Sequence, residues 1–202
     1  MFVQVFQGRV ENPDQVRAAL DRWVRELAPD SVGWLGSTAG VTADGRFIAL
    51  ARFESETAAR RNSERPEQDK WWTETAQLFS EQPVFADSIG VEVDVVGDPD
   101  TAGFVQVIQG RSRDPERARE IMRQDPELWA TFRPDVLASI AVEHEGQAFT
   151  TAIYFTSEAE AREGERKEPP EEIRAAMEEM NSLSIGEPTF FDIPDPWLYS
   201  RG

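Results

Sequence analysis

The stretch FVQVFQGR, residues 2–9, is the most informative part of the sequence for the fold because it occurs twice in the chain. It returns 102 residues later as FVQVIQGR, residues 104–111. Over the fourteen positions from Met1 to Asp14, eight residues are identical in the second copy. A repeat of this length is too long for a solenoid, whose units have about 20–50 residues. The sequence therefore predicts a duplicated domain.

Two later stretches repeat as well. FESE at residues 53–56 returns as FTSE at residues 155–158, and PVFAD at residues 83–87 returns as PTFFD at residues 188–192. The Gly- and Pro-containing stretch GDPDTAG, residues 97–103, has the composition of a linker. We expect a first repeat at 1–97, a linker at 98–103, a second repeat at 104–193 and a tail at 194–202 that docks on the body.

Each copy predicts the element order β-α-β-β-α-β. Residues 2–9 alternate as a strand does, and Asn12-Pro13 is typical of a helix start. Strands are expected at 33–41 and 46–53 around an Asp-Gly turn, and Ser55 and Ser157 are N-cap candidates for the second helix. The closing strand is expected at 88–96 in the first copy and at 189–193 in the second. This order defines an α+β, ferredoxin-like unit.

A single unit of this kind covers one face of its sheet with helices and leaves the other face bare. A bare apolar face needs a second sheet or exposes a large apolar area. We therefore expect two tandem ferredoxin-like β-α-β-β-α-β repeats packed sheet to sheet as a pseudo-dimeric α/β barrel.

Composition excludes several classes of function. The 202 residues include 21 Lys and Arg against 38 Asp and Glu, a formal net charge of −17, which disfavours nucleic acid and anionic membranes as partners. The chain has no cysteine, so thiolate metal sites and thiolate nucleophiles are excluded. No stretch approaches the ~20 apolar residues of a membrane span, and no signal peptide is recognisable. A cytoplasmic protein without metal or cofactor is expected.

The duplicated unit resembles the dimeric α/β-barrel superfamily, and its closest likeness is the antibiotic-biosynthesis-monooxygenase-like group. The resemblance rests on the opening strand, the Phe-X-Ser-Glu stretch before the second helix and the aromatic-rich second helix. It implies a small-molecule protein. Members include cofactor-independent oxygenases of polyketide or quinol-like aromatics, haem-degrading monooxygenases, small isomerases and many proteins of unknown activity. Their pocket lies between the sheet and the second helix or within the barrel.

The resemblance also directs attention to particular residues. Haem-degrading members carry a histidine on the second helix, and neither copy has one there, which argues against haem. Monooxygenase-like members have an Asn and a Trp near the pocket. Asn62 and Trp72 are therefore the predicted catalytic residues, with Trp71 as a ligand contact. They lie in the first copy only, because Gly164 stands where Asn62 would repeat. Of Trp71 and Trp72, one is expected in the core and the other at a pocket or the surface, since adjacent helical residues diverge by about 100°.

Four further residues are candidate ligand contacts. Gln4 and Gln106 occupy matching strands and would point into the barrel; the favoured alternative is a hydrogen-bonded pair near the pseudo-two-fold axis, because a buried amide needs a partner. Arg52 and Tyr154 also match and would reach a pocket mouth, where an Arg can hold a carboxylate or phenolate. The favoured alternative for them is a salt bridge or a solvent-facing strand end.

The single histidine, His144, lies between two glutamates near a hairpin turn and is expected to be solvated. The sequence as a whole predicts a small-molecule-binding protein resembling cofactor-independent monooxygenases of aromatic or quinol-like substrates. Its expected state is a monomeric pseudo-dimer or a homodimer. The alternatives are a non-catalytic ligand-binding or stress-associated module of the same fold, and a purely structural oligomer if no cavity exists between sheet and helices.

Overall fold

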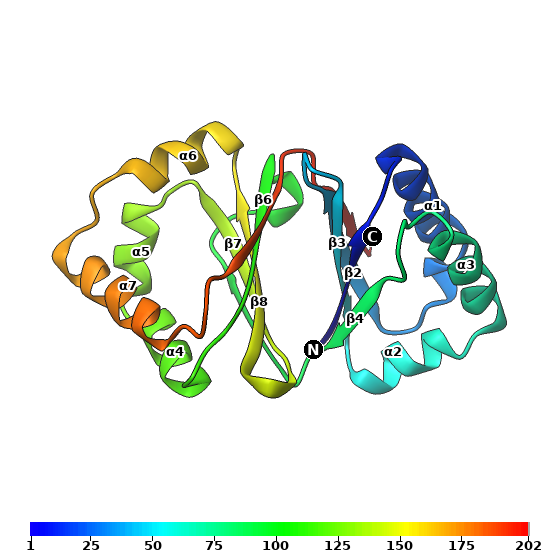
Figure 1. Ribbon diagram of the computed structural model, residues 1–202, viewed down its shortest axis with the longest axis horizontal. Helices are drawn as coiled ribbons and strands as arrows, with labels where there is room; N and C mark the ends of the chain where they lie inside the picture. The colour runs from blue at the N-terminus through cyan, green and yellow to red at the C-terminus, as the bar shows by residue number, and fades with distance from the viewer. Residues whose placement is uncertain (202) are drawn as a thin grey trace. The chain divides into compact units, whose positions relative to one another are not determined.

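The computed structural model describes residues 1–201, which form two compact units. Unit 1 comprises residues 1–91 together with the C-terminal residues from Asp195, and unit 2 comprises Glu92–Pro194. Each unit has a five-stranded antiparallel sheet with helices on one face (Figure 1). The fold class predicted from the sequence, α+β with two tandem ferredoxin-like repeats, is confirmed.

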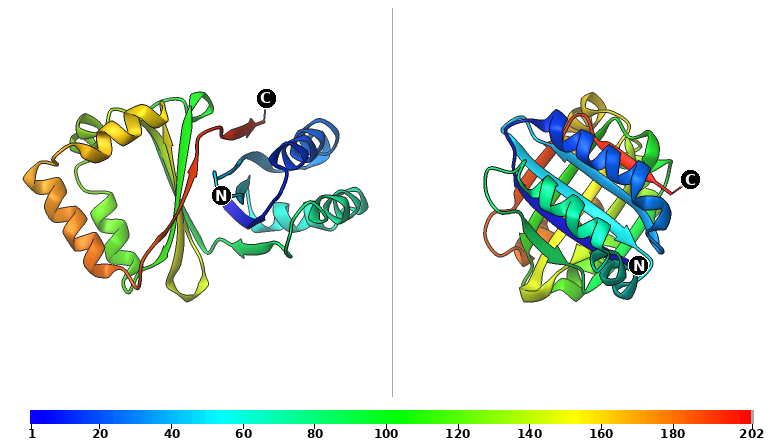
Figure 2. Two further views of the ribbon diagram at one scale, coloured as in Figure 1. Left: turned by 45° about the horizontal axis from the view of Figure 1, so that its top comes forward. Right: turned by 90° about the vertical axis from the view of Figure 1, so that its right-hand side faces the viewer.

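The sheet of unit 1 has the strand order β10-β2-β3-β1-β4. Its helices α1 and α3 lie side by side across one face of that sheet (Figure 2, right). The elements of unit 1 are β1 (Phe2–Arg9), α1 (Pro13–Glu26), η1 (Ala28–Asp30), β2 (Trp34–Val41), β3 (Arg46–Phe53), α2 (Glu56–Ser63), α3 (Pro66–Ala76), β4 (Val84–Asp87) and β10 (Trp197–Ser200).

Local sequence accounts for the boundaries in unit 1. The Asn12 side chain caps α1 by accepting a hydrogen bond from the Gln15 backbone N–H at 3.3 Å, and Ser55 caps α2 in the same way through Ala58. Gly45 has a φ of 80° in the turn between β2 and β3, a conformation that favours glycine. Pro66 separates α2 from α3 because a proline suits only the first turn of a helix.

The sheet of unit 2 has the strand order β5-β7-β8-β6-β9. Its elements are β5 (Gly90–Val95), η2 (Pro99–Thr101), β6 (Phe104–Arg111), α4 (Pro115–Met122), α5 (Pro126–Phe132), β7 (Val136–Glu143), η3 (Glu145–Gln147), β8 (Ala148–Phe155), α6 (Glu158–Arg166), α7 (Glu171–Leu183) and β9 (Thr189–Ile193). The first helix of the repeat is broken here into α4 and α5, with Asp125 at a φ of 47° between them.

The strand expected to close the first copy at residues 88–96 does not do so. The short strand β4 closes unit 1 instead by pairing with β1, while β5 pairs with β7 in the sheet of unit 2. The reason lies in the repeat itself, since PVFAD at 83–87 matches PTFFD at 188–192, which forms β9. The last strand of the first copy, β5, thus joins the sheet built by the second copy, and the compact units do not coincide with the sequence repeats.

The tail, which follows the second copy, adds a strand to the sheet of unit 1. Residues 197–200 form β10 and pair with β2, so that Leu198 lies opposite Thr38. Trp197 is buried in the core of unit 1, with its ring centroid 6.1 Å from that of Phe47. The tail therefore supplies part of the core of unit 1, as expected of a tail that docks on the body.

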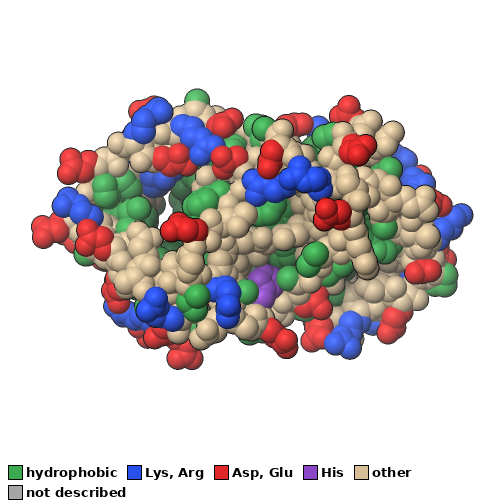
Figure 3. All heavy atoms as spheres, in the orientation of Figure 1, with side chains coloured by type: hydrophobic (Ala, Val, Ile, Leu, Met, Phe, Trp, Pro, Cys, Tyr) green, Lys and Arg blue, Asp and Glu red, His purple; other side chains and the backbone are tan. Residues whose placement is uncertain are grey.

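Surface charge is mixed. On the face shown in Figure 3, Lys and Arg side chains are interspersed with Asp and Glu side chains and form no separate basic patch. Among residues 1–201, no helix is both long and apolar enough to cross a membrane.

Candidate functional site

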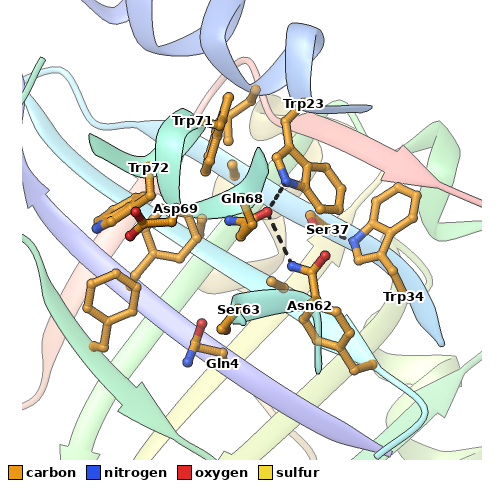
Figure 4. A pocket seen from close by; sticks show the side chains of 17 residues that line it. Gln4, Trp23, Trp34, Ser37, Asn62, Ser63, Gln68, Asp69, Trp71 and Trp72 are labelled. Atoms are coloured by element: carbon orange, nitrogen blue, oxygen red, sulfur yellow. Dashed lines mark hydrogen bonds between the residues drawn. The ribbon is translucent and has the colours of Figure 1, made fainter. Parts of the chain in front are cut away.

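Unit 1 contains a cavity of about 290 Å³ between the helical layer and the sheet (Figure 4). It lies where the resemblance placed a pocket, and it is large enough for a small ring system. Its walls come from β1, β2, β3, β4 and from all three helices. The residues that line it are Gln4, Phe6, Leu20, Trp23, Trp34, Ser37, Ala39, Ala49, Ala51, Phe53, Asn62, Ser63, Gln68, Asp69, Trp71, Trp72 and Phe85.

Four tryptophans form the aromatic wall of this cavity. The ring centroid of Trp23 lies 5.2 Å from that of Trp34 and 6.3 Å from that of Trp71, and Trp71 lies 6.0 Å from Trp72. These separations are within the 4.5–7 Å range, roughly, in which aromatic rings attract one another. Small alanines on β2 and β3 lie below the rings and leave the space open.

An amide network crosses the cavity. Gln68 Oε1 accepts one hydrogen bond from Trp23 Nε1 at 2.6 Å and a second from Asn62 Nδ2 at 3.3 Å. Asn62 Oδ1 in turn accepts from an Arg65 guanidinium N–H at 3.1 Å, and the same guanidinium nitrogen donates to the Leu27 carbonyl at 3.1 Å. Asn62 is only 6% exposed. The network fixes which way both amides point.

Two other indole N–H groups bond within the protein. Trp34 Nε1 donates to Ser37 Oγ at 3.1 Å, and Trp71 Nε1 donates to the Ala19 carbonyl at 2.9 Å. Bonds of this kind hold the ring planes in place, because turning a ring would leave its N–H without an acceptor. Together with the bond of Trp23 to Gln68, they orient three of the four indole rings of the wall.

The structure brings four of the seven predicted site residues together at this cavity: Gln4, Asn62, Trp71 and Trp72. Trp71 is 6% exposed and packs in the core, while Trp72 is partly buried; both rings nevertheless line the cavity. Their Cα positions are adjacent, yet Trp72 also contacts Phe6 and Phe85 at the β4 edge, with centroids 5.7 and 5.0 Å away.

The other three predicted residues lie elsewhere. Arg52 alternates with Ala51 and Phe53 on β3, so it lies on the opposite face of the sheet, where it donates to the Tyr199 carbonyl at 3.4 Å. Tyr154 belongs to unit 2 and is 1% exposed, which does not fit a pocket mouth. Gln106 is also in unit 2 and is buried.

Both glutamine side chains are hydrogen-bonded within their own units. Gln4 Nε2 donates to Asp87 Oδ1 at 2.8 Å, and Gln106 Nε2 donates to Asp192 Oδ1 at 2.9 Å. Each amide thus finds its partner on the neighbouring edge strand of its own sheet, β4 or β9. The hydrogen-bond partner that a buried amide was expected to need is thus an aspartate in each sheet.

Unit 2 is built differently at the place that corresponds to Asn62. Gly164 stands there, and the Arg133 side chain lies directly against it. Arg133 forms an ion pair with Asp135 at 2.7 Å, the two side chains being 17% and 6% exposed, and its guanidinium lies 5.2 Å above the Phe155 ring. The expected divergence of the two copies is therefore visible in the side chains, and the predicted Asn and Trp lie in unit 1 alone.

His144 is a correction to the sequence analysis. It is 8% exposed rather than solvated, and its Nε2 lies 2.9 Å from Thr150 Oγ1 on the adjacent strand β8. Hairpin pairing brings Thr150 within reach of the ring, which a reading of the neighbouring glutamates alone does not reveal.

No group of three or more His, Asp or Glu residues among residues 1–201 has the arrangement of a metal site.

A second hollow, of about 570 Å³, lies beside α1 and α3. It is lined mostly by charged side chains of both signs, among them Arg22, Glu26, Lys70 and Glu74. Such a lining is typical of a solvated surface groove rather than of an apolar ligand site.

Sequence reasoning missed several residues of the main cavity. Trp23 and Trp34 come from elements far from α3 in the sequence, and only the fold brings them to Trp71. The helical spacing could have indicated Gln68 and Asp69 as cavity residues. They precede Trp71 and Trp72 by three residues each and therefore lie on the same helix face as these tryptophans.

Comparisons with known proteins agree with this architecture. No family model matches the sequence, and no curated protein matches it. A proposed monooxygenase from Lactobacillus acidophilus NCFM has a similar structure, with a TM-score of 0.72, 11% identity, and coverage of 100% of this chain and 96% of that chain. A proposed monooxygenase from Fusobacterium nucleatum gives a TM-score of 0.73 at 9% identity over 100% and 94% of the two chains.

An anthrone oxidase-like protein is similar as well, with a TM-score of 0.68, 11% identity, and coverage of 98% of this chain and 92% of that chain. Identities this low show a common fold. The resemblance stated from the sequence is confirmed at the level of the fold: the chain has the tandem ferredoxin-like fold of these monooxygenase-like and anthrone oxidase-like structures.

Proposed function

We propose that unit 1 binds a small aromatic molecule in the tryptophan-lined cavity and promotes its oxidation by O2 without a cofactor. The observation that carries the proposal is the combination of four indole rings with a buried, oriented amide pair around one cavity. Indole walls provide stacking and edge contacts for a flat ring, each worth about 0.5–1.5 kcal/mol beyond burial. The amides provide polar contacts at a fixed place.

The reaction requires little from the protein. An aromatic ketone with an acidic CH2 group, such as anthrone, loses a proton to give an electron-rich anion that reacts with O2 itself. One oxygen atom becomes the new carbonyl of anthraquinone, the other leaves as water, and the substrate supplies all four electrons. The protein must exclude bulk water, hold the ring and stabilise the developing oxyanion with fixed N–H donors. The similarity in fold to an anthrone oxidase-like protein makes anthrone the first substrate to try.

The experiment measures O2 uptake and anthraquinone formation with anthrone, after subtraction of the spontaneous reaction. The variant Asn62→Ala/Trp72→Ala is expected to lose at least tenfold in rate while keeping its circular dichroism spectrum. Trp129→Ala is the matched control, since Trp129 lies on α5 of unit 2 and does not line the cavity. Equal rates for the wild type and the double variant would exclude this site.

Quenching of tryptophan fluorescence by anthraquinone, the unreactive product, separates binding from turnover. Binding that the double variant loses, without O2 uptake in the wild type, would instead support the non-catalytic ligand-binding module. Absence of both would contradict the proposal as a whole. The structural-oligomer alternative required the absence of a cavity between sheet and helices, and a cavity is present there.

We also propose that the protein acts as a monomeric pseudo-dimer or as a homodimer of such chains. Native mass spectrometry of the purified protein tests this directly, with species expected at 22.8 kDa or at twice that mass. A tightly held aromatic ligand from the host would appear in the same spectrum as a non-covalent addition.

A further inference from the structure

Asp69 is the one charged residue among the described residues that line the cavity. It lies on α3, three residues before Trp72, and the side chains of both residues line the cavity (Figure 4). Within residues 1–201 it forms no ion pair. Asp69 is exposed to solvent as well as lining the cavity. A carboxylate there without a cationic partner is free to accept a proton or a hydrogen bond from a ligand.

Gln68, the residue before Asp69, supplies a donor on the same side. Its Oε1 already accepts from Trp23 Nε1 and Asn62 Nδ2, so this oxygen is occupied. The amide nitrogen has no partner among the described residues, and in Figure 4 it points away from Trp23 and Asn62 towards the side of Asp69 and Trp72. The double acceptance also fixes the amide orientation, because turning it by 180° would bring N–H groups against the two donors.

A donor and an acceptor side by side favour one kind of ligand group. Resting on the proposed function, we propose that the cavity selects hydroxy-aromatic or enolisable keto-aromatic molecules, with Asp69 as proton acceptor and Gln68 Nε2 as donor to the ligand oxygen. A hydroxyl group satisfies both residues at once: it donates its proton to Asp69 and accepts from Gln68. An aromatic ammonium ion would satisfy Asp69 alone, since it has no acceptor for the Gln68 N–H.

The same pair accounts for the first step of the proposed oxidation. The substrate enters this step as its enol, a hydroxyarene: its O–H bond breaks, the proton forms an O–H bond on Asp69, and the electron pair stays on the substrate oxygen, which becomes the oxyanion. Gln68 Nε2–H donates to that oxygen and stabilises its charge. O2 is the oxidant for the steps that follow, and the proton on Asp69 is available to the peroxide that forms.

Binding of unreactive probes tests the assignment. The probes are 2-naphthol and 2-methoxynaphthalene, which share the ring system but differ in the O–H donor, and the readout is quenching of tryptophan fluorescence. The wild type is expected to bind 2-naphthol about tenfold more tightly than the methyl ether, the effect of a hydrogen bond to a charged group. Asp69→Asn should remove most of this preference and leave binding of the ether unchanged.

Glu67→Gln is the matched control. Glu67 is the other acidic residue in the first turn of α3, is exposed, and does not line this cavity, so the variant changes the charge of the helix start equally. It should bind both probes as the wild type does. With anthrone as substrate, Asp69→Asn should also lower kcat by tenfold or more with little change in KM, since the proton transfer and not the ring binding is lost.

Three outcomes would overturn the proposal. The preference for 2-naphthol could survive in Asp69→Asn, or Glu67→Gln could lose it equally. A cationic probe, 2-naphthylmethylamine, could bind more tightly than 2-naphthol in an Asp69-dependent manner, which would make Asp69 a counter-ion. If no probe binds to the wild type or to either variant, the proposed aromatic site itself is contradicted. This result differs from a failure of the Asp69 assignment alone, because binding of the methyl ether depends on the cavity and not on Asp69.

Discussion

Trp23 Nε1 donates to Gln68 Oε1 at 2.6 Å, and this bond joins α1 to α3 above the cavity. The same oxygen accepts from Asn62 at the end of α2. One side chain therefore ties together all three helices of unit 1, so stability and the shape of the cavity depend on the same residue.

Gln68→Leu should destabilise the protein by about 1–3 kcal/mol, because it leaves the N–H groups of Trp23 and Asn62 without an acceptor. Urea denaturation followed by circular dichroism measures the loss. Gln77→Leu is the control, since Gln77 is exposed at the end of α3 and should change the free energy of unfolding by less than about 0.5 kcal/mol. A loss of equal size in both variants would mean that the network does not stabilise the fold.

The buried ion pair in unit 2 gives a second prediction. Asp135→Ala should cost about 3 kcal/mol, because the Arg133 guanidinium would stay largely buried without its counter-charge. Glu168→Ala is the comparison, as Glu168 and Arg174 form an exposed pair at 3.9 Å and should contribute less than about 1 kcal/mol. Urea denaturation of the two variants compares their free energies of unfolding. Similar losses of stability in both would show that Arg133 finds other partners or water.

The repeat made the fold predictable. Because FVQVFQGR and its copy were recognised, the strands at 2–9 and 46–53 and the helix start at Asn12 could be placed correctly before the structure was known. The positions of β5 beside β7 and of β10 beside β2 could not be predicted from the sequence. Pairing between strands far apart in the chain depends on which edge strand of a sheet is unpaired. The PVFAD repeat at 83–87 indicated the strand β4. The alternation of apolar and polar residues at 88–96 was a clearer strand pattern, and the closing strand was therefore predicted there.

The site was predictable only in part. Asn62, Trp71 and Trp72 came from a resemblance and lie together on α2 and α3. Trp34 reaches the same cavity from β2, and no spacing rule connects it to α3. Arg52 and Tyr154 do not line this cavity, because matching positions in two repeats say nothing about which face of a strand meets the helices.

The C-terminal strand carries a third prediction, because Trp197 is 5% exposed and packs against Phe47. The Arg17 guanidinium lies 5.7 Å from the centroid of the Trp197 ring and also forms an ion pair with Asp195 at 2.7 Å. Trp197→Ala should therefore cost about 3–5 kcal/mol by leaving a void in the core of unit 1. Leu198→Ala, a partly exposed neighbour on the same strand, should cost clearly less in the same thermal or urea experiment. Equal losses would place the contribution of β10 in its backbone pairing with β2 rather than in the Trp197 ring.

The last prediction concerns pH and the pair that joins α4 to α7. Arg117 donates to both carboxylate oxygens of Glu179, at 2.6 and 2.9 Å, and these hydrogen bonds hold the pKa of Glu179 below its ordinary value of 4.5. A carboxyl group whose pKa is lower in the folded state stabilises the fold above its ordinary pKa, and this contribution is lost as the pH falls from 4.5 through the folded value. The effect on stability is small because both side chains are exposed.

An NMR titration of the Glu179 side-chain carboxyl therefore tests the lowered pKa of Glu179 better than a measurement of unfolding does. In Arg117→Gln the midpoint should rise towards 4.5, and in the wild type added salt should raise it in the same direction. Arg174→Gln, which removes a positive charge from α7 without touching Glu179, should leave the midpoint where it is. If Arg174→Gln shifts the midpoint as much as Arg117→Gln, the cause is the general charge of the helix, and the bidentate pair does not set the pKa of Glu179.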